Sequence, residues 1–178
     1  MNSIKLLPGD YYVTRKNETI MTVLGSCISA CIYDPAKNVG GMNHFMLPEG
    51  EGSSLIDEGA RYGSFAMENT INEIIKVGGV KSNLLVKVFG GARIIEGAGS
   101  VGMRNIEFVE NYLKLEKIKL VSSCVGDIYP LKVKFYPVTG KVLVKKLESL
   151  QKSSVSQREQ VYSKQLKGKN IEGDIELF

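Results

Sequence analysis

The chain has 178 residues, of which 43% are hydrophobic and 24% charged, with a formal net charge of +4. Because domains commonly hold about 100–200 residues, this length favours one domain, and the composition excludes disordered, collagen-like and coiled-coil classes for the whole chain. Residues 1–140 carry 15 basic and 14 acidic side chains, so the excess charge lies in the C-terminal part. There is no basic stripe with interleaved aromatic residues, so nucleic acid is not expected as a partner.

Nothing in the chain resembles a targeting or membrane segment. Residues 1–12 include Lys5, Pro8 and Asp10 and therefore lack the apolar core of a signal peptide, and no run of 18 apolar residues is present. Three cysteines are an odd number, which without a secretory signal indicates free thiols in a reducing compartment. We therefore predict a cytoplasmic protein with no membrane insertion.

In the first third of the chain, the pattern predicts short strands separated by polar turns. The strands are expected at residues 11–14, 20–24 and 40–47, the last ended by Pro48, and residues 28–33 form another apolar stretch. Residues 49–59 are polar and glycine-rich, which is typical of a loop, and this loop is a candidate rim for a site.

In the rest of the chain, helices and strands alternate. Helical spacing of apolar residues predicts helices at 60–77 and about 105–117, with strands at 84–89 and 118–125 and a hairpin over 132–136 and 141–146. Beyond Leu147 the periodicity is lost, so we predict a domain over residues 1–147 and a polar, basic extension over 148–178. The interleaved elements predict an α/β or α+β fold with helices packed on a mixed sheet.

The chain holds a single histidine, His44, which restricts the chemistry available to it. Mechanisms that need two histidines are excluded, and any cysteine–histidine pair must use His44 with Cys27, Cys31 or Cys124. Cys27 follows a glycine and a serine at the end of a predicted strand. A helical turn beginning there would point free N–H groups at the thiol, favouring the thiolate and stabilising an oxyanion. Cys31 lies among apolar residues, as a packed core thiol does, and Cys124 has no activating neighbour in sequence.

The pattern around His44 leaves other interpretations open. Strand alternation places His44 on one face with Met42 and Met46, where a buried structural histidine is the more common outcome. A zinc site of Cys27, Cys31, Cys124 and His44 is conceivable, but there is no CxxC pair and the ligands are scattered, so no metal is expected. The glycine-rich stretches at 90–91 and 97–102 lack a phosphate-binding motif and are interpreted as turns, so no cofactor is expected either.

Several motifs together resemble the chemoreceptor glutamine deamidases, the CheD family. The most specific are Leu24-Gly25-Ser26-Cys27 and Gly40-Gly41-Met42-Asn43-His44-Phe45-Met46-Leu47-Pro48. Further matches are the segments at 9–12, 31–34, 62–68, 87–92, 102–107 and 139–142, so the resemblance covers about residues 4–147. Residues 125–131 depart from the family pattern, where many relatives carry a Gly-Gly segment with basic residues.

The resemblance implies a fold, an activity and partners. It implies a layered α/β sandwich similar to the catalytic domains of cysteine–histidine deamidating toxins. It also implies hydrolysis of selected glutamines to glutamate and ammonia in methyl-accepting chemotaxis receptors, without a cofactor. By the same resemblance, Cys27 is the nucleophile, His44 the base and Thr22 the third catalytic position, while Gly25 and Ser26 contribute to substrate binding or an oxyanion site.

Other functions remain compatible with the sequence. Some family members bind a chemotaxis phosphatase of the CheC type, so the chain could act mainly as an adaptor. A related cysteine–histidine acyl-transfer enzyme, such as a transglutaminase or a peptidase, is the second alternative.

Overall fold

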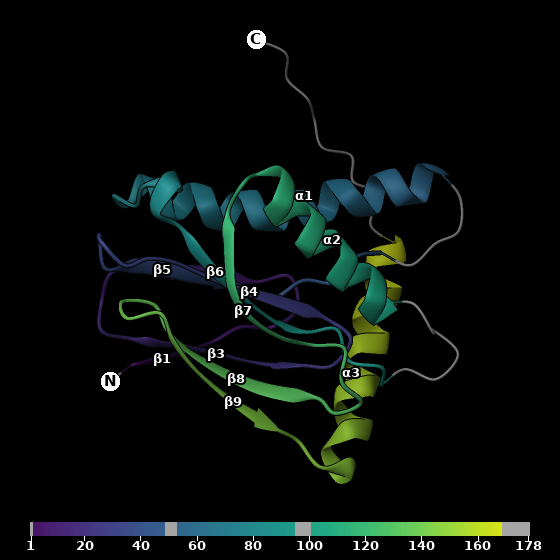
Figure 1. Cartoon of the computed structure of the whole chain (residues 1–178). Helices are drawn as coiled ribbons and strands as arrows, with labels where there is room; N and C mark the ends of the chain where they lie inside the picture. Colours follow the sequence, from purple (N-terminus) through teal and green to yellow (C-terminus); the bar gives the residue numbers. More distant parts are fainter. Residues whose placement is uncertain (1, 49–52, 95–100, 169–178) are drawn as a thin grey trace.

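The computed structural model describes residues 2–48, 53–94 and 101–168, which form two β-sheets and three α-helices in layers (Figure 1). The first sheet has the strand order β1-β3-β8-β9, and the second has the order β2-β5-β4-β6-β7. The strands are β1 (Ser3–Lys5), β2 (Tyr11–Thr14), β3 (Thr19–Leu24), β4 (Ile28–Asp34), β5 (Val39–Asn43), β6 (Leu85–Gly90), β7 (Lys119–Val125), β8 (Leu131–Tyr136) and β9 (Lys141–Lys146). The helices are α1 (Ser53–Lys76), α2 (Val101–Leu115) and α3 (Ser149–Gly168), with a 3-10 turn at Lys81–Asn83.

Two large apolar cores hold the layers together, and a third, smaller cluster includes Val155 of α3. Helices α1 and α2 cover the outer face of the second sheet (Figure 1), and the core between them includes Phe45, Met67 and Ile74. The two sheets enclose the other core, which includes Ile20, Met42 and the thiol of Cys31. Most strand neighbours are antiparallel, but β1 pairs with β3 and β6 with β7 in parallel. The predicted layered α/β sandwich with helices on a mixed sheet is therefore confirmed.

The helix starts differ from those predicted. Helix α1 begins at Ser53, so residues 53–59 are helical and not part of a loop, while residues 49–52 of that expected rim lie outside the described residues. Helix α2 begins at Val101 rather than near residue 105. In both cases glycines and polar residues in the first turns conceal the helix, because propensity is a weak guide where tertiary packing supports the element.

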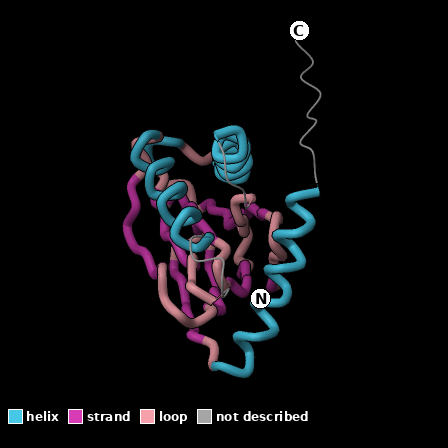
Figure 2. Tube along the Cα trace, turned by 90° about the vertical axis from the view of Figure 1, so that its right-hand side faces the viewer, coloured by secondary structure: helices cyan, strands magenta, loops and turns pink. Residues whose placement is uncertain are grey.

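The C-terminal part of the chain forms α3, which crosses the ends of the strands at one edge of the sandwich (Figures 1 and 2). Among the α3 residues whose side chains are described, 153–166, the buried ones are Val155, Glu159 and Ser163. They are spaced four residues apart and therefore share one face of the helix. No helix among the described residues is long and apolar enough to cross a membrane.

Candidate active site

Cys27 lies at a corner where the chain leaves one sheet and enters the other. Strand β3 of the first sheet ends at Leu24, and β4 of the second begins at Ile28, so Gly25, Ser26 and Cys27 form the connection. The helical turn considered at Cys27 does not form, because the chain passes directly into strand β4. The amide N–H groups of these three residues nevertheless converge on one point, since all of them donate to the same carboxylate.

A glycine on the neighbouring strand β6 makes this corner possible. Gly90 has a φ of +110°, and a Cβ atom there would lie 2.1 Å from the carbonyl oxygen of Cys27. Both the backbone conformation and the close approach therefore require glycine. The next residue, Gly91, donates its N–H to that same Cys27 oxygen at 2.8 Å. Gly90 is therefore the last residue of strand β6 rather than part of the predicted turn, and the glycine pair supports the Cys27 backbone.

His44 is held in place by backbone contacts with the N-terminal segment. Its N–H donates to the carbonyl oxygen of Asp10 at 2.9 Å, and its own carbonyl oxygen accepts from the N–H of Gly9 at 2.7 Å. Met42 and Met46 lie in the core between the sheets, whereas Phe45 lies in the core beneath the helices. The predicted alternation is therefore confirmed. His44 lies on the same face of the strand as Met42 and Met46, which share a core with Cys27.

Thr22 fixes the tautomer of the His44 ring. The Thr22 hydroxyl donates to the carbonyl oxygen of Leu6 at 3.0 Å and lies 2.7 Å from His44 Nδ1. A hydroxyl has one proton to donate, so Nδ1 must carry the hydrogen and donate it to Thr22. The lone pair of the neutral ring is therefore on Nε2. That atom is buried and has no hydrogen-bond partner in the described structure.

Cys27 and His44 lie close to each other in a buried environment. The sulfur of Cys27 and a ring nitrogen of His44 lie within 4.8 Å of each other, and both side chains are buried. Burial raises the pKa of the Cys27 thiol well above its usual value, and the nearby carboxylate of Glu159 raises it further. Burial also lowers the pKa of His44 to about 3, helped by the charge of Arg158. In this arrangement the pair is a neutral thiol beside a neutral imidazole.

Asn105 of α2 joins the two segments that carry this pair. Its side-chain nitrogen donates to the carbonyl oxygen of Ser26 at 2.8 Å, and its side-chain oxygen accepts from the N–H of Leu47 at 2.9 Å. It is fully buried. The sequence pattern assigned it no role, although a polar residue among the apolar positions of a predicted helix was a possible signal.

The fourth side chain in the site is Glu159 of α3, which the sequence motifs did not reveal. One carboxylate oxygen accepts from the N–H of Gly25 at 2.8 Å and of Cys27 at 3.1 Å. The other accepts from the N–H and the hydroxyl of Ser26, both at 2.7 Å. The carboxylate is buried and accepts four hydrogen bonds, three of them from consecutive backbone amides.

The positions of the thiols exclude the Cys3His zinc site. The potential ligands that converge among the described residues are Cys27, His44 and Glu159, without Cys31 or Cys124. Cys31 packs between the sheets, and burial raises the pKa of its thiol. The converging trio is also a poor metal site, because its carboxylate already accepts four hydrogen bonds, about as many as its lone pairs allow.

Comparison with known proteins agrees with this geometry. The family model described as CheD chemotactic sensory transduction matches residues 46–146. The chain belongs to the CheD family. A protein from Hahella chejuensis is 50% identical over 98% of this chain and 84% of its own length, and one from Janthinobacterium sp. is 50% identical over 99% and 89%. One from Hydrogenovibrio crunogenus is 44% identical over 100% and 95%. All three are named probable chemoreceptor glutamine deamidase CheD.

Proposed function

We propose that this CheD family member hydrolyses side-chain amides of glutamine residues in chemoreceptors, giving glutamate and ammonia. The observation that carries the proposal is the Cys27 thiol beside the imidazole of the only histidine, whose Nε2 has no hydrogen-bond partner in the described structure, next to three backbone N–H groups that hold a carboxylate. The names of the relatives identify glutamine side chains of chemoreceptors as the substrate of this family.

In the first half of the reaction, Cys27 is the nucleophile and His44 the general base. Nε2 takes the thiol proton, and the sulfur attacks the amide carbon of the glutamine, which forms a C–S bond and places negative charge on the amide oxygen. The N–H groups of Gly25, Ser26 and Cys27 stabilise that oxyanion. Preorganised donors of this kind are typically worth about 10²–10³ in rate. His44 then returns its proton to the departing nitrogen, so the C–N bond breaks and ammonia leaves.

In the second half, water replaces the ammonia. His44 takes a proton from a water molecule and the hydroxide attacks the thioester. The C–S bond then breaks, His44 returns its proton to the departing sulfur to restore the Cys27 thiol, and the new carboxylic acid ionises to glutamate in water. Thr22 is a positioning residue, because it accepts from His44 Nδ1 and so keeps Nε2 free for both proton transfers. The reaction requires no cofactor and no metal.

The proposal also includes a compartment and a further binding partner. The free thiols of Cys27, Cys31 and Cys124 fit a reducing compartment, and we propose that the enzyme works in the cytoplasm. A CheC-type phosphatase as an additional binding partner is a prediction from the family resemblance.

The test is mass spectrometry of receptor fragments after incubation with the wild-type protein, Cys27→Ala and Cys31→Ala. The proposal predicts conversion of glutamine to glutamate by the wild type and by Cys31→Ala, and none by Cys27→Ala. Cys31 is the matched control because it is an equally buried thiol outside the site. Receptor glutamines that stay unchanged in all samples, while the protein binds a CheC-type phosphatase, would favour the adaptor. Incorporation of an amine or cleavage of the backbone would indicate another acyl-transfer enzyme.

A further inference from the structure

The helix α3 presents an unusual face to the body of the protein. At its centre, the buried stripe has Glu159, flanked by Val155 one turn before and Ser163 one turn after. A helix that only stabilises a fold buries an apolar stripe, as α1 does with Met67, Ile71 and Ile74. The α3 interface also has apolar members, since Val155, Tyr162 and Leu166 pack against apolar clusters, but a buried carboxylate and a small polar residue lie among them.

The carboxylate of Glu159 occupies the position that the reaction requires for the substrate. It lies within 4.8 Å of both the Cys27 sulfur and a His44 ring nitrogen. It also accepts hydrogen bonds from the N–H groups of Gly25, Ser26 and Cys27, which together form the N–H cradle of the site. A glutamate side chain is also the chemical product of glutamine deamidation. Glu159 therefore stands where a newly formed product carboxylate would stand, carried on a helix of the same chain.

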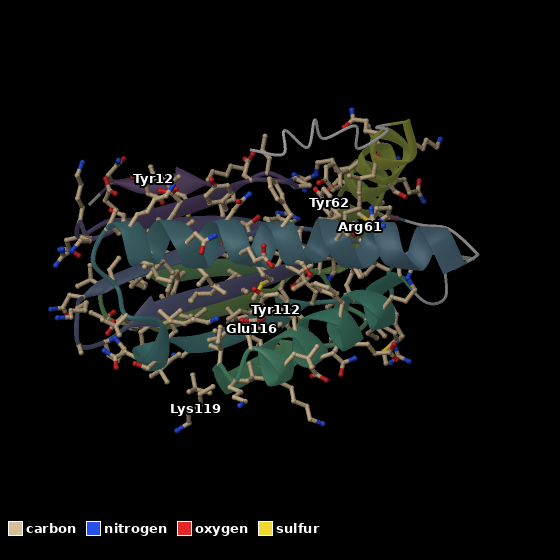
Figure 3. All side chains as sticks on the ribbon, turned by 90° about the horizontal axis from the view of Figure 1, so that it is seen from above. Tyr12, Arg61, Tyr62, Tyr112, Glu116 and Lys119 are labelled. Atoms are coloured by element: carbon tan, nitrogen blue, oxygen red, sulfur yellow. The ribbon has the colours of Figure 1, made fainter. Side chains whose placement is uncertain are left out.

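The fit depends on the absence of a side chain at Gly25. A Cβ atom there would lie 2.1 Å from Ile94 Cδ1 and 2.7 Å from a Glu159 carboxylate oxygen, so glycine leaves room for both side chains. Away from the cradle, α3 is held by a hydrogen bond between the hydroxyls of Tyr162 and Tyr62 of α1. Figure 3 shows Tyr62 on the part of α1 that lies next to α3.

The described residues leave little open space at the site, since Cys27 and His44 are both buried. A small pocket of about 50 Å³ remains between α3 and the N-terminal segment, lined by residues that include Leu6, His44, Val155 and Glu159. This volume admits a water molecule or two but not a glutamine side chain. Because Glu159 already accepts from the three N–H groups, a receptor glutamine can place its amide oxygen there only after Glu159 has left.

We propose that α3 is an intramolecular inhibitor that docks in the substrate groove through Glu159 as a product mimic, and that a receptor segment must displace it. This inference rests on the proposed function, since it takes Cys27 and the N–H cradle as the deamidation site. In the docked state the carboxylate and the burial that α3 imposes raise the pKa of the thiol and keep it protonated, whereas an open site loses the carboxylate and gains solvent. Docking thus blocks both access and activation of the nucleophile.

The most specific test replaces the Glu159 carboxylate by the side-chain amide that the enzyme is proposed to hydrolyse. In a full-length Glu159→Gln variant, the amide at position 159 lies where a receptor glutamine would lie. Cys27 attacks its side-chain carbon, ammonia leaves with a proton from His44, and water hydrolyses the thioester to leave glutamate. Residue 159 should then be about 1 Da heavier in this variant than in the Glu159→Gln, Cys27→Ala double variant, as measured on peptides that contain it. The exposed neighbours Gln157 and Gln160 are internal controls and should remain glutamine.

A second test measures the inhibition itself. Glu159→Ala should raise the rate of receptor deamidation at low receptor concentration by about tenfold. In the wild type, α3 occupies the site in most molecules, and only the fraction of molecules with an open site can bind a receptor segment. Gln160→Ala on the exposed side of α3 should leave the rate unchanged. If Glu159→Ala folds poorly, Ser163→Lys provides the same test, since it disturbs the docked face without altering the cradle.

The possible failures can be told apart. If the Glu159→Gln variant deamidates receptors but keeps its own amide at position 159, the inference is overturned and the proposed function stands. A Glu159→Ala rate equal to or below wild type would overturn the inference as well, because Glu159 would then be structural or would assist catalysis. If the wild type leaves receptors unchanged and the Glu159→Gln variant leaves position 159 unchanged, the proposed function and the inference fail together.

Discussion

The core beneath α1 and α2 and the corner beneath α3 are both buried, but they contain different kinds of side chain. The helix-covered core is apolar, with Ile28, Phe45 and Ile74 among its members. The corner brings together a threonine, a histidine, a thiol and a carboxylate, all with less than 3% of their surface exposed. Burying polar groups is costly unless each finds a partner, so the corner is organised for chemistry and the core for stability. Substitutions in the two regions should therefore affect different measurements.

The largest effect is expected at His44. His44→Gln removes the general base, so receptor deamidation should fall about 10²–10⁴-fold. The unfolding midpoint should stay close to that of the wild type, because glutamine can still bond to Thr22. Kinetics by mass spectrometry and thermal unfolding would be measured on the same sample. A His44→Gln variant that loses stability but keeps its deamidation rate would show that His44 serves stability rather than chemistry.

The matched change in the helix-covered core is Ile74→Ala. Ile74 is fully buried on α1, so the cavity left should lower the free energy of unfolding by about 2–5 kcal/mol. The rate per folded molecule should be unchanged, because Ile74 belongs to the helix-covered core and not to the corner. Urea unfolding gives the first quantity and the deamidation assay the second. A large loss of rate in a folded sample would mean that the two regions are coupled.

A smaller effect is expected at Thr22. Thr22→Val keeps the shape of the side chain but removes the partner of His44 Nδ1, which should cost about 1–3 kcal/mol of transition-state stabilisation, or roughly five- to 150-fold in kcat. Thr22→Ser keeps the hydroxyl and should recover most of the rate. If the serine variant is as slow as the valine variant, Thr22 acts through packing and does not position the ring.

The smallest effect is a pH dependence of stability. His44 has a pKa of about 3 in the folded protein, against about 6.5 in an unfolded chain. Between these values the unfolded chain binds more protons, so the free energy of unfolding falls as the pH is lowered below about 6.5. The loss should be about 1 kcal/mol by about pH 5.5. Cys27, Arg158 and Glu159 face the ring and do not change this direction. Denaturant titrations of the wild type and His44→Gln should differ in this window, and identical slopes would contradict a buried neutral His44.

Part of the site could be predicted from the sequence because it depends on local constraints. With one histidine, only His44 could serve as imidazole base, and strand alternation correctly placed Met42 and Phe45 on opposite faces. The Gly25-Ser26 pair marked Cys27 as the thiol at a sharp corner. The layered α/β fold followed from the family resemblance and from the interleaved elements.

The remaining features depend on contacts between distant parts of the chain. Glu159 is separated from Cys27 by 132 residues, and in the sequence it is one of several charged residues in a largely polar segment. Asn105 likewise gains its role only when α2 packs over the corner. The N–H cradle was expected from a helical turn, but a corner between two sheets provides it. Spacing could not distinguish these cases, because both leave consecutive amides unpaired.

One comparison tests the roles of Cys27 and Glu159 together. Receptor fragments are incubated with the wild type, Cys27→Ala or Glu159→Ala, and glutamate formation is followed by mass spectrometry. We expect no conversion by Cys27→Ala, measurable conversion by the wild type, and conversion about tenfold faster by Glu159→Ala. Glutamate formation by Cys27→Ala at the wild-type rate would contradict the assignment of Cys27 as the nucleophile.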